Sequence, residues 1–243
     1  DEVLVPPLTF VSTASVVLQQ NAIPVFVDID PNTYCIDISD LERKVTEKTK
    51  AIIPVHIFGH PANMPEIHRI ASRYNLTIIA DAAQAHGAKI TGVPIGAYGD
   101  MSCYSFFQTK NMTTGEGGMV LTNNEDLLCK LHLKREHGSP RNTKTWYVYD
   151  TLGFNYSMTE LQAAIGIVQL SKLENMNNQR KANAAQYVKE LADTRLILPT
   201  KDPTCQSVYH NFPVLLPVGM ELHRQQFVDA IRAENVPADV CYP

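Results

Sequence analysis

Two charged residues stand out because each occupies a position where a side chain can do chemistry. Asp81 directly follows the apolar run TIIA, and strands of α/β sheets present ligand-binding groups at their carboxyl ends. Lys110 lies in the polar stretch SFFQTKN, just before the glycine-rich TTGEGGM. A lysine amine whose pKa is lowered by its surroundings is a nucleophile toward carbonyl groups. Each residue also has an ordinary explanation, since an aspartate after a strand often caps the next segment and a loop lysine is usually a solvated charge.

Alternating strand and helix patterns predict the sheet that must position these side chains. The β-rich runs lie at 3–5, 23–27, 51–55, 77–80, 101–105 and 118–122, and helix-length segments lie at 10–20, 39–45 and 64–74. This alternation is typical of βαβ units. We therefore predict an α/β protein with three α/β/α layers and a mainly parallel sheet.

The second half of the sequence predicts one long helix and then a change of domain. Apolar residues recur at helical spacing over about 159–191, with no proline and one glycine. A strand at 207–216, a helix at 221–234 and a strand at 238–242 are expected to follow. The predicted domains are thus a large one at 1–193 and the beginning of a small α+β C-terminal domain at 194–243.

Composition limits the classes of partner. A net charge of -4, with no block of basic residues, argues against nucleic acid or an acidic membrane surface and favours a small-molecule substrate. Five scattered cysteines without a CxxC pair indicate a reducing compartment, and no apolar run approaches the ~20 residues of a membrane helix. We expect a cytoplasmic location. The chain opens without methionine in an expected strand, so we also expect the natural N-terminus to lie upstream.

The histidines do not predict a metal site. His56 and His60 have the HxxxH spacing of a helical metal pair, but Pro54, Gly59 and Pro61 oppose a helix there. The glycines of TTGEGGM match neither a Walker loop nor a dinucleotide fingerprint. His86 is either near a ligand or a structural histidine.

Taken together, the segments DAAQAHG, SFFQTKN and TTGEGGM closely resemble the DegT/DnrJ/EryC1/StrS family of pyridoxal phosphate (PLP) dependent sugar aminotransferases. Flanking stretches match as well: VPPLTFVSTA, PVFVDIDPNTY, AIIPVHIFG and LGFNYSMTELQAAIG. The resemblance covers residues 1 to about 190 and is weaker beyond 194. It implies the large domain of the fold type I, aspartate aminotransferase-like PLP enzymes.

The resemblance also implies roles for three residues. Lys110 would form an imine with the PLP aldehyde and, once displaced by the amino donor, carry the proton as base and then acid. Asp81 would keep the pyridine nitrogen protonated, as an adjacent carboxylate does by opposite-charge stabilisation. Gln84 would donate a hydrogen bond to the phenolic oxygen of the ring, although a surface or capping glutamine is the plain alternative.

Three further cofactor contacts follow from the same resemblance. Phe10 matches the aromatic residue that stacks on the ring, with an ordinary core phenylalanine as the alternative. Ser105 matches a hydroxyl that binds the phosphate. Asn155 matches a residue that reaches the phosphate from the partner subunit, which implies a homodimer with a shared active site.

Two departures from the family pattern affect these expectations. The family's main phosphate-binding turn is expected before residue 1, and we expect the chain as given to bind PLP less well without it. Ser157 stands where the NYRM version of the motif has arginine. A contact of that arginine to substrate or to the partner subunit is therefore in doubt.

The predicted function is a transaminase that moves an amino group from glutamate to a nucleoside diphosphate 4-keto or 3-keto hexose. Two alternatives stay open: a PLP enzyme acting on a cyclitol or another keto acceptor, and a non-catalytic dimeric scaffold of the same fold. Joint retention of Asp81, Gln84 and Lys110 disfavours the scaffold. The related sugar dehydratases resemble this family but carry histidine in place of the lysine, and Lys110 argues against that branch.

Overall fold

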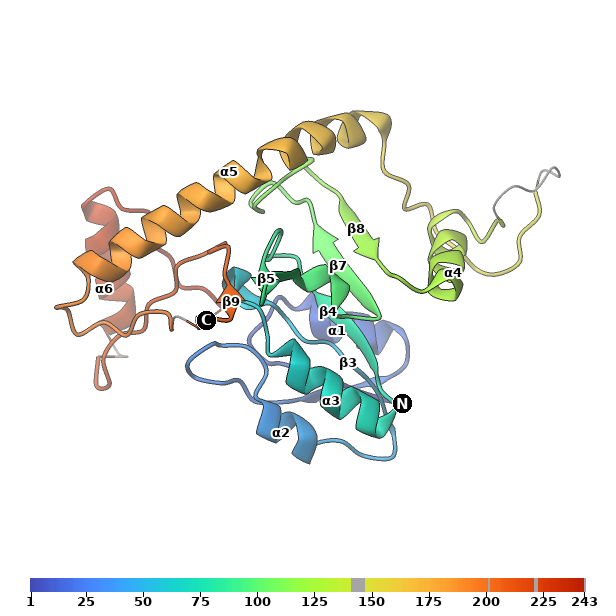
Figure 1. The fold of residues 1–243 in the computed structure, drawn as a ribbon, viewed down its shortest axis with the longest axis horizontal. Helices are drawn as coiled ribbons and strands as arrows, with labels where there is room; N and C mark the ends of the chain where they lie inside the picture. The colour runs from blue at the N-terminus through green and yellow to red at the C-terminus, as the bar shows by residue number, and fades with distance from the viewer. Residues whose placement is uncertain (141–146, 201, 221–222, 243) are drawn as a thin grey trace.

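The computed structural model describes residues 1–140, 147–200, 202–220 and 223–242. Its main sheet consists of β1 (Glu2–Val5), β2 (Ile23–Phe26), β3 (Thr49–Ile52), β4 (Thr77–Asp81), β7 (Met101–Ser105) and β8 (Gly118–Leu121). The spatial order is β2-β1-β3-β4-β7-β8 (Figure 1). All neighbours pair in parallel except β8, which is antiparallel to β7. The predicted, mainly parallel sheet is confirmed.

Helices cover both faces of this sheet. They are α1 (Ser12–Gln19), α2 (Ile38–Arg43) and α3 (Met64–Tyr74). The chain moves in opposite directions along the sheet in the crossovers β1 to β2 and β2 to β3, so right-handed connections place α1 on one face and α2 and α3 on the other. Figure 1 shows this arrangement. The three-layer α/β fold is confirmed.

The core forms where the apolar side of α3 meets the sheet. Met64, Ile67 and Ile70 recur at helical spacing and are fully buried, and they belong to one apolar cluster with Ile52 of β3 and Ile78 of β4. Because β3 and β4 are central strands covered on both faces, they carry apolar residues on both sides. This packing fixes the position of the residues that follow β4.

The long helix α5 (Glu160–Glu190) confirms the helix expected at about 159–191. It begins with a capping box, in which the Thr159 side chain accepts from the backbone N–H of Gln162 while the Gln162 side chain accepts from the backbone N–H of Thr159. In Figure 1 the helix runs from the side of β8 toward the C-terminal α6 (Arg224–Ala233). The helix α4 (Glu125–Arg135), which precedes α5 in the sequence, was not expected from the sequence.

The C-terminal region corrects two sequence predictions. The strand expected at 207–216 is wrong: β9 (Cys205–Gln206) pairs instead with β5 (Lys89–Ile90), which pairs with β6 (Val93–Pro94). Backbone groups after β9 form hydrogen bonds outside any strand pairing. The Val208 N–H donates to the Gly59 carbonyl, and the Arg180 side chain donates to the carbonyls of Tyr209 and His210. The strand expected at 238–242 is also wrong, because those residues form no strand.

Other expectations for this region have different outcomes. The helix expected at 221–234 is observed as α6, and its first two expected residues lie outside the described part of the chain. The domain boundary at 193/194 stays a prediction. Two short 3-10 turns, η1 (Ile57–Gly59) and η2 (Ile95–Ala97), complete the fold. Within the described ranges, none of the helices has both the length and the apolar character that a membrane span requires.

Candidate active site

Asp81 and Lys110 meet at the carboxyl edge of the sheet. Asp81 is the last residue of β4 and pairs in register with Cys103 of the adjacent, parallel β7. Lys110 lies in the turn after β7, where its backbone N–H donates to the Phe107 carbonyl at 3.0 Å. Since parallel strands end at the same edge, the two side chains are brought to one place from segments far apart in sequence.

The Asp81 carboxylate is poorly solvated. Burial raises the pKa of this carboxyl, and three contacts oppose the shift. The backbone N–H of Ala83 donates to Oδ1 at 2.9 Å, the Lys110 amine attracts the negative charge, and the Thr13 hydroxyl donates to Oδ2 at 3.4 Å. The pKa remains raised after these contacts, so the carboxylate would gain from a further cation or N–H donor.

The Lys110 amine is shifted toward its neutral, nucleophilic form. Burial lowers its pKa, while the negative charge of Asp81 works in the opposite direction. The charge of each side chain therefore influences the pKa of the other, which places the two side chains in the same region of the structure. Lys110 is half-buried, whereas a solvated loop lysine is exposed to bulk solvent.

Gln84, three residues after Asp81, is buried, and both ends of its amide form hydrogen bonds. Its Oε1 accepts from the backbone N–H of Phe58 at 2.7 Å, and its Nε2 donates to the Tyr242 hydroxyl at 2.8 Å. It is therefore not a surface glutamine. An amide nitrogen carries two hydrogens, so one donor remains for a ring oxygen. Tyr242 was not found from sequence, because its contact joins residues 158 positions apart.

Phe10 lies in the turn that leads into α1, with 63% of its surface exposed. Its carbonyl accepts from the backbone N–H of Thr13 at 3.1 Å, and Thr13 in turn contacts Asp81. Phe10 is thus no core phenylalanine, and it lies one contact away from the carboxylate. Thr13 was missed from sequence, although its position three residues after Phe10, at the start of a helix, could have indicated it.

Ser105 and His86 border the same edge. Ser105 is the last residue of β7, and its Oγ accepts from the backbone N–H of Phe107 at 3.2 Å. His86 is buried between the rings of Tyr104 and Phe106, at centroid distances of 5.2 and 5.9 Å. Burial and the nearby Lys110 charge lower the pKa of His86 to about 4, so the imidazole is neutral near pH 7.

Among the predicted cofactor-binding residues, Asn155 alone does not lie near the edge of the sheet that carries Asp81. It is exposed in the connection between α4 and α5 and forms an isolated antiparallel bridge with Glu136. Ser157, which stands in place of the family arginine, donates to the Glu136 carboxylate at 3.0 Å. This segment extends beyond β8, away from the edge that carries Asp81 (Figure 1).

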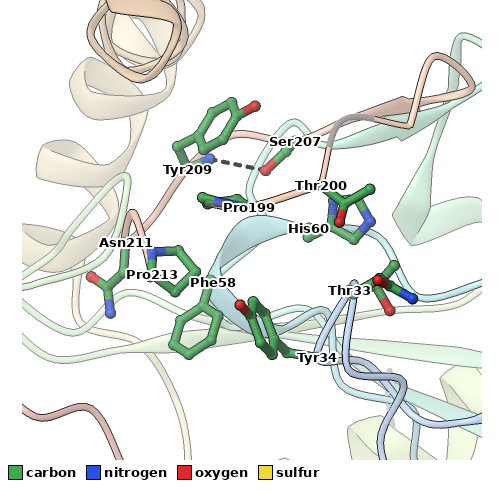
Figure 2. Close-up of a pocket in the computed structure, with 11 residues that line it drawn as sticks. Thr33, Tyr34, Phe58, His60, Pro199, Thr200, Ser207, Tyr209, Asn211 and Pro213 are labelled. Atoms are coloured by element: carbon green, nitrogen blue, oxygen red, sulfur yellow. Dashed lines mark hydrogen bonds between the residues drawn. The ribbon is translucent and has the colours of Figure 1, made fainter. Parts of the chain in front are cut away.

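A hollow adjoins the site on the side of Phe58. Figure 2 shows Tyr34 and Phe58 below it and the segment with Ser207 and Tyr209 above it, where the Tyr209 backbone N–H donates to the Ser207 hydroxyl. Asn211 also lines the hollow. Because Phe58 donates to Gln84, the hollow begins one residue from the amide that faces the site.

The HxxxH pair is structural in this fold. His56 is fully buried and its Nδ1 accepts from the Ala62 backbone N–H at 3.0 Å, and η1 separates it from His60. Burial lowers the pKa of His56 to about 3. Among the described residues no group of three or more histidine, cysteine or acidic side chains is placed to hold a metal ion.

The residues at this edge fit PLP. A pyridinium N–H would give the Asp81 carboxylate a further, charged donor, and the amine of Lys110 has the lowered pKa that favours imine formation with an aldehyde. Gln84 retains an amide hydrogen for a ring oxygen, and the Ser105 hydroxyl lies at the end of the neighbouring strand.

Comparison with known proteins agrees with this geometry. The sequence profile of the DegT/DnrJ/EryC1/StrS aminotransferase family matches residues 1–243. The chain belongs to this family. One relative is a UDP-N-acetyl-3-dehydro-alpha-D-glucosamine 3-aminotransferase of Acidithiobacillus ferrooxidans. Its sequence is 40% identical to that of this chain, and the match covers 100% of this chain and 64% of the relative.

Two other proteins are similar to most or all of the chain. An L-glutamine:2-deoxy-scyllo-inosose aminotransferase of Streptomyces fradiae is 35% identical over 100% of the DegT-family chain and 60% of its own length. The S. venezuelae protein DesV, solved in complex with a ketimine intermediate, superposes with a TM-score of 0.86 and 35% identity, covering 94% of this chain and 61% of DesV. The chain spans less than two thirds of the length of each of these relatives.

Proposed function

We propose that the chain carries the cofactor site of a PLP-dependent aminotransferase that places an amino group on a nucleotide-linked keto sugar. The observation that carries the proposal is the placement of Asp81 at the end of β4 and of Lys110 in the turn after the adjacent β7, where the charge of each side chain influences the pKa of the other. A scaffold without turnover has no need for this arrangement.

The residues divide the work as follows. When bound, PLP supplies an aldehyde and a ring that accepts electron density. Asp81 would hold a proton at the pyridine nitrogen, and the Lys110 amine would hold the cofactor through its aldehyde and serve as the base and then the acid for a proton carried at Nζ. Gln84 would donate to the phenolic oxygen, and Phe10 and Ser105 would hold the ring plane and the phosphate.

The acceptor is proposed from the names of the relatives, and the donor from the resemblance to the family. The A. ferrooxidans relative is named for a UDP-linked 3-keto sugar, which supports a nucleoside diphosphate keto hexose. Glutamate, the donor that the resemblance implies, is the proposed amino donor, and the L-glutamine for which the S. fradiae relative is named is the alternative donor. The S. fradiae relative is named for an inosose, so a keto cyclitol is the second candidate acceptor. A cytoplasmic location, without nucleic acid or membrane partners, stays a prediction.

The active protein in this proposal is a homodimer that shares its sites. An apolar surface runs along β8 and α5, where Met119, Leu161, Ile165 and Val168 are 48 to 79% exposed, and continues at Tyr156 beside Asn155. Large exposed apolar surfaces commonly mark protein contacts. A second copy seated there would bring its Asn155 toward the phosphate. Leu161→Glu is expected to yield monomers in sedimentation experiments, whereas Val218→Glu, at a site elsewhere that is 92% exposed, is expected to leave dimers.

Spectroscopy of the full-length protein tests the role of Lys110. With PLP, the parent protein should show an absorption band that borohydride removes, and peptide mass spectrometry should find the reduced adduct on Lys110. Lys110→Ala should lack both signals, while Lys48→Ala, which removes an exposed lysine, should retain them. An unchanged spectrum and a trapped adduct elsewhere in the Lys110→Ala protein would contradict the assignment.

Release of 2-oxoglutarate from glutamate tests the acceptor. We expect turnover with at least one nucleoside diphosphate 3-keto or 4-keto hexose and none with the reduced sugars. Turnover with 2-deoxy-scyllo-inosose alone would select the cyclitol alternative. Absence of turnover with every keto acceptor, in a protein that traps PLP on Lys110, would contradict the proposed acceptor class and leave the cofactor chemistry standing.

A further inference from the structure

The residue directly after Lys110 is the centre of a buried polar network. Asn111 is 3% exposed. Its Nδ2 donates to Asn177 Oδ1 at 2.9 Å and to the Val208 carbonyl at 3.3 Å, and its Oδ1 lies 3.1 Å from His210 Nδ1. Both hydrogens and the oxygen of one amide are therefore used, by α5 on one side and by the segment after β9 on the other.

Backbone carbonyls fix the direction of every bond in this network. Asn177 Nδ2 donates to the His86 carbonyl at 2.8 Å, which leaves Asn177 Oδ1 as an acceptor. Asn111 must then direct its nitrogen toward Asn177 and the Val208 carbonyl, so its oxygen faces His210. An oxygen accepts, and therefore His210 Nδ1 carries the hydrogen and Nε2 does not.

The same imidazole is adjacent to the amine. Burial lowers the pKa of His210 to about 4, with the positive charge of Lys110 as the next contribution. The ring is therefore neutral near pH 7, in one tautomer, within the electrostatic reach of Lys110. The segment that carries it is closely held: Gly59 has φ of +86°, and a Cβ built there would lie 2.9 Å from the Val208 side chain.

We propose that Asn111 and His210 are positioning residues for Lys110: their hydrogen bond locks the imidazole in its Nδ1–H tautomer and holds the backbone from which the amine extends. This inference rests on the proposed function, since it concerns the same nucleophile. It also connects the residue after Lys110 to α5 and to the segment 207–211, from which Ser207, Tyr209 and Asn211 line the hollow of Figure 2.

Paired substitutions at His210 separate positioning from mere packing. In His210→Asn the amide nitrogen replaces the Nδ1 donor, whereas His210→Leu keeps a comparable volume without a donor. Mixing PLP-free protein with PLP and trapping with borohydride gives the rate at which Lys110 captures the cofactor. We expect His210→Leu and Asn111→Ala to slow capture about tenfold, as misplacement of a reacting group does, and His210→Asn to remain within about twofold of the parent.

A remote variant controls for lost stability. Asp40→Asn removes charge from a buried group in α2, on a different part of the fold, and should leave the capture rate unchanged despite a lower unfolding midpoint. Equal capture rates in His210→Leu and the parent, or equally slow capture in His210→Asn and His210→Leu, would overturn the inference. Failure of the parent itself to form an adduct on Lys110 would overturn the proposed function as well, which distinguishes the two.

Discussion

Asp81 and Lys110 each oppose the shift that burial imposes on the other. Burial raises the pKa of the Asp81 carboxyl and lowers that of the Lys110 amine, and the attraction between the two charges works against both effects. The pair thus combines an amine of lowered pKa with a carboxyl of raised pKa at one edge of the sheet. Removing either charge should therefore shift the titration of its partner in a predictable direction.

The first prediction concerns Lys110 in the PLP-free protein. The negative charge of Asp81 favours the ammonium form, so Asp81→Asn should lower the pKa of Lys110 further and increase its neutral fraction. The pH midpoint of Lys110 acetylation, followed by mass spectrometry, should therefore decrease. Lys48, acetylated in the same samples, provides an internal control. A midpoint that rises or stays constant would show that the two side chains do not interact.

The second prediction concerns turnover by the same variant. Without the carboxylate, the pyridine nitrogen loses its proton more readily, so the half-reaction with the amino donor should slow about 100-fold in Asp81→Asn. Asp81→Glu keeps the charge and should lose less. Single-turnover kinetics at saturating PLP separate this effect from cofactor affinity. Asp81→Asn is thus expected to make the Lys110 amine more reactive in acetylation and to slow turnover. A variant that is merely misfolded would not show both effects.

The third prediction tests the shared site. If Asn155 serves the site of the partner subunit, a dimer of one Lys110→Ala chain and one Asn155→Asp chain contains one intact site and one site with both defects. Co-refolding equal amounts of the two inactive proteins should therefore restore about one quarter of the parental activity, as expected for random pairing in a symmetric dimer. Mixtures without recovery would place Asn155 in its own subunit's site or outside any site.

The sheet and its chemistry-bearing edge were predictable because they depend on local patterns. Strands such as β4 are short apolar runs that lie between segments with helical spacing of apolar residues. Asp81 is the last residue of its own strand, so the position of the strand also gives the position of Asp81. Lys110 follows β7 in the same way. A motif close to the end of a strand can be located once the strand is located. Asp81 and Lys110 were therefore predicted without knowledge of any long-range contact.

The positions missed from sequence depend on contacts between distant segments. The Asn111 network joins residues that are 66 to 99 positions apart, and Gln84 meets Tyr242 across 158 positions. The strand expected at 207–216 failed for the same reason, because the Gly59 carbonyl and Arg180 take up the backbone groups that a strand would have paired. β-propensity marks a segment that can pair and does not say which partner it meets.

The last prediction concerns stability at low pH and a residue outside the site. Asp40 is 8% exposed, accepts from the Asp28 backbone N–H at 2.7 Å and pairs with Lys44 at 2.8 Å and with Arg43. The backbone N–H, followed by Lys44, lowers the pKa of this carboxyl to about 2. Because the folded pKa lies below the unfolded value of about 3.9, the stabilisation is present above about pH 4 and is lost as the pH falls toward 2.

Asp40→Asn should accordingly lower the free energy of unfolding by about 2 kcal/mol at pH 7, which corresponds to the difference between the two pKa values. Urea midpoints of parent and variant, measured from pH 7 to pH 3, should converge below about pH 4, where the unfolded parent chain begins to take up the proton. Asp193→Asn, at an exposed position after α5, should follow the parent throughout. A constant difference down to pH 3 would show that lost packing, and not lost charge, explains the effect of the Asp40 substitution.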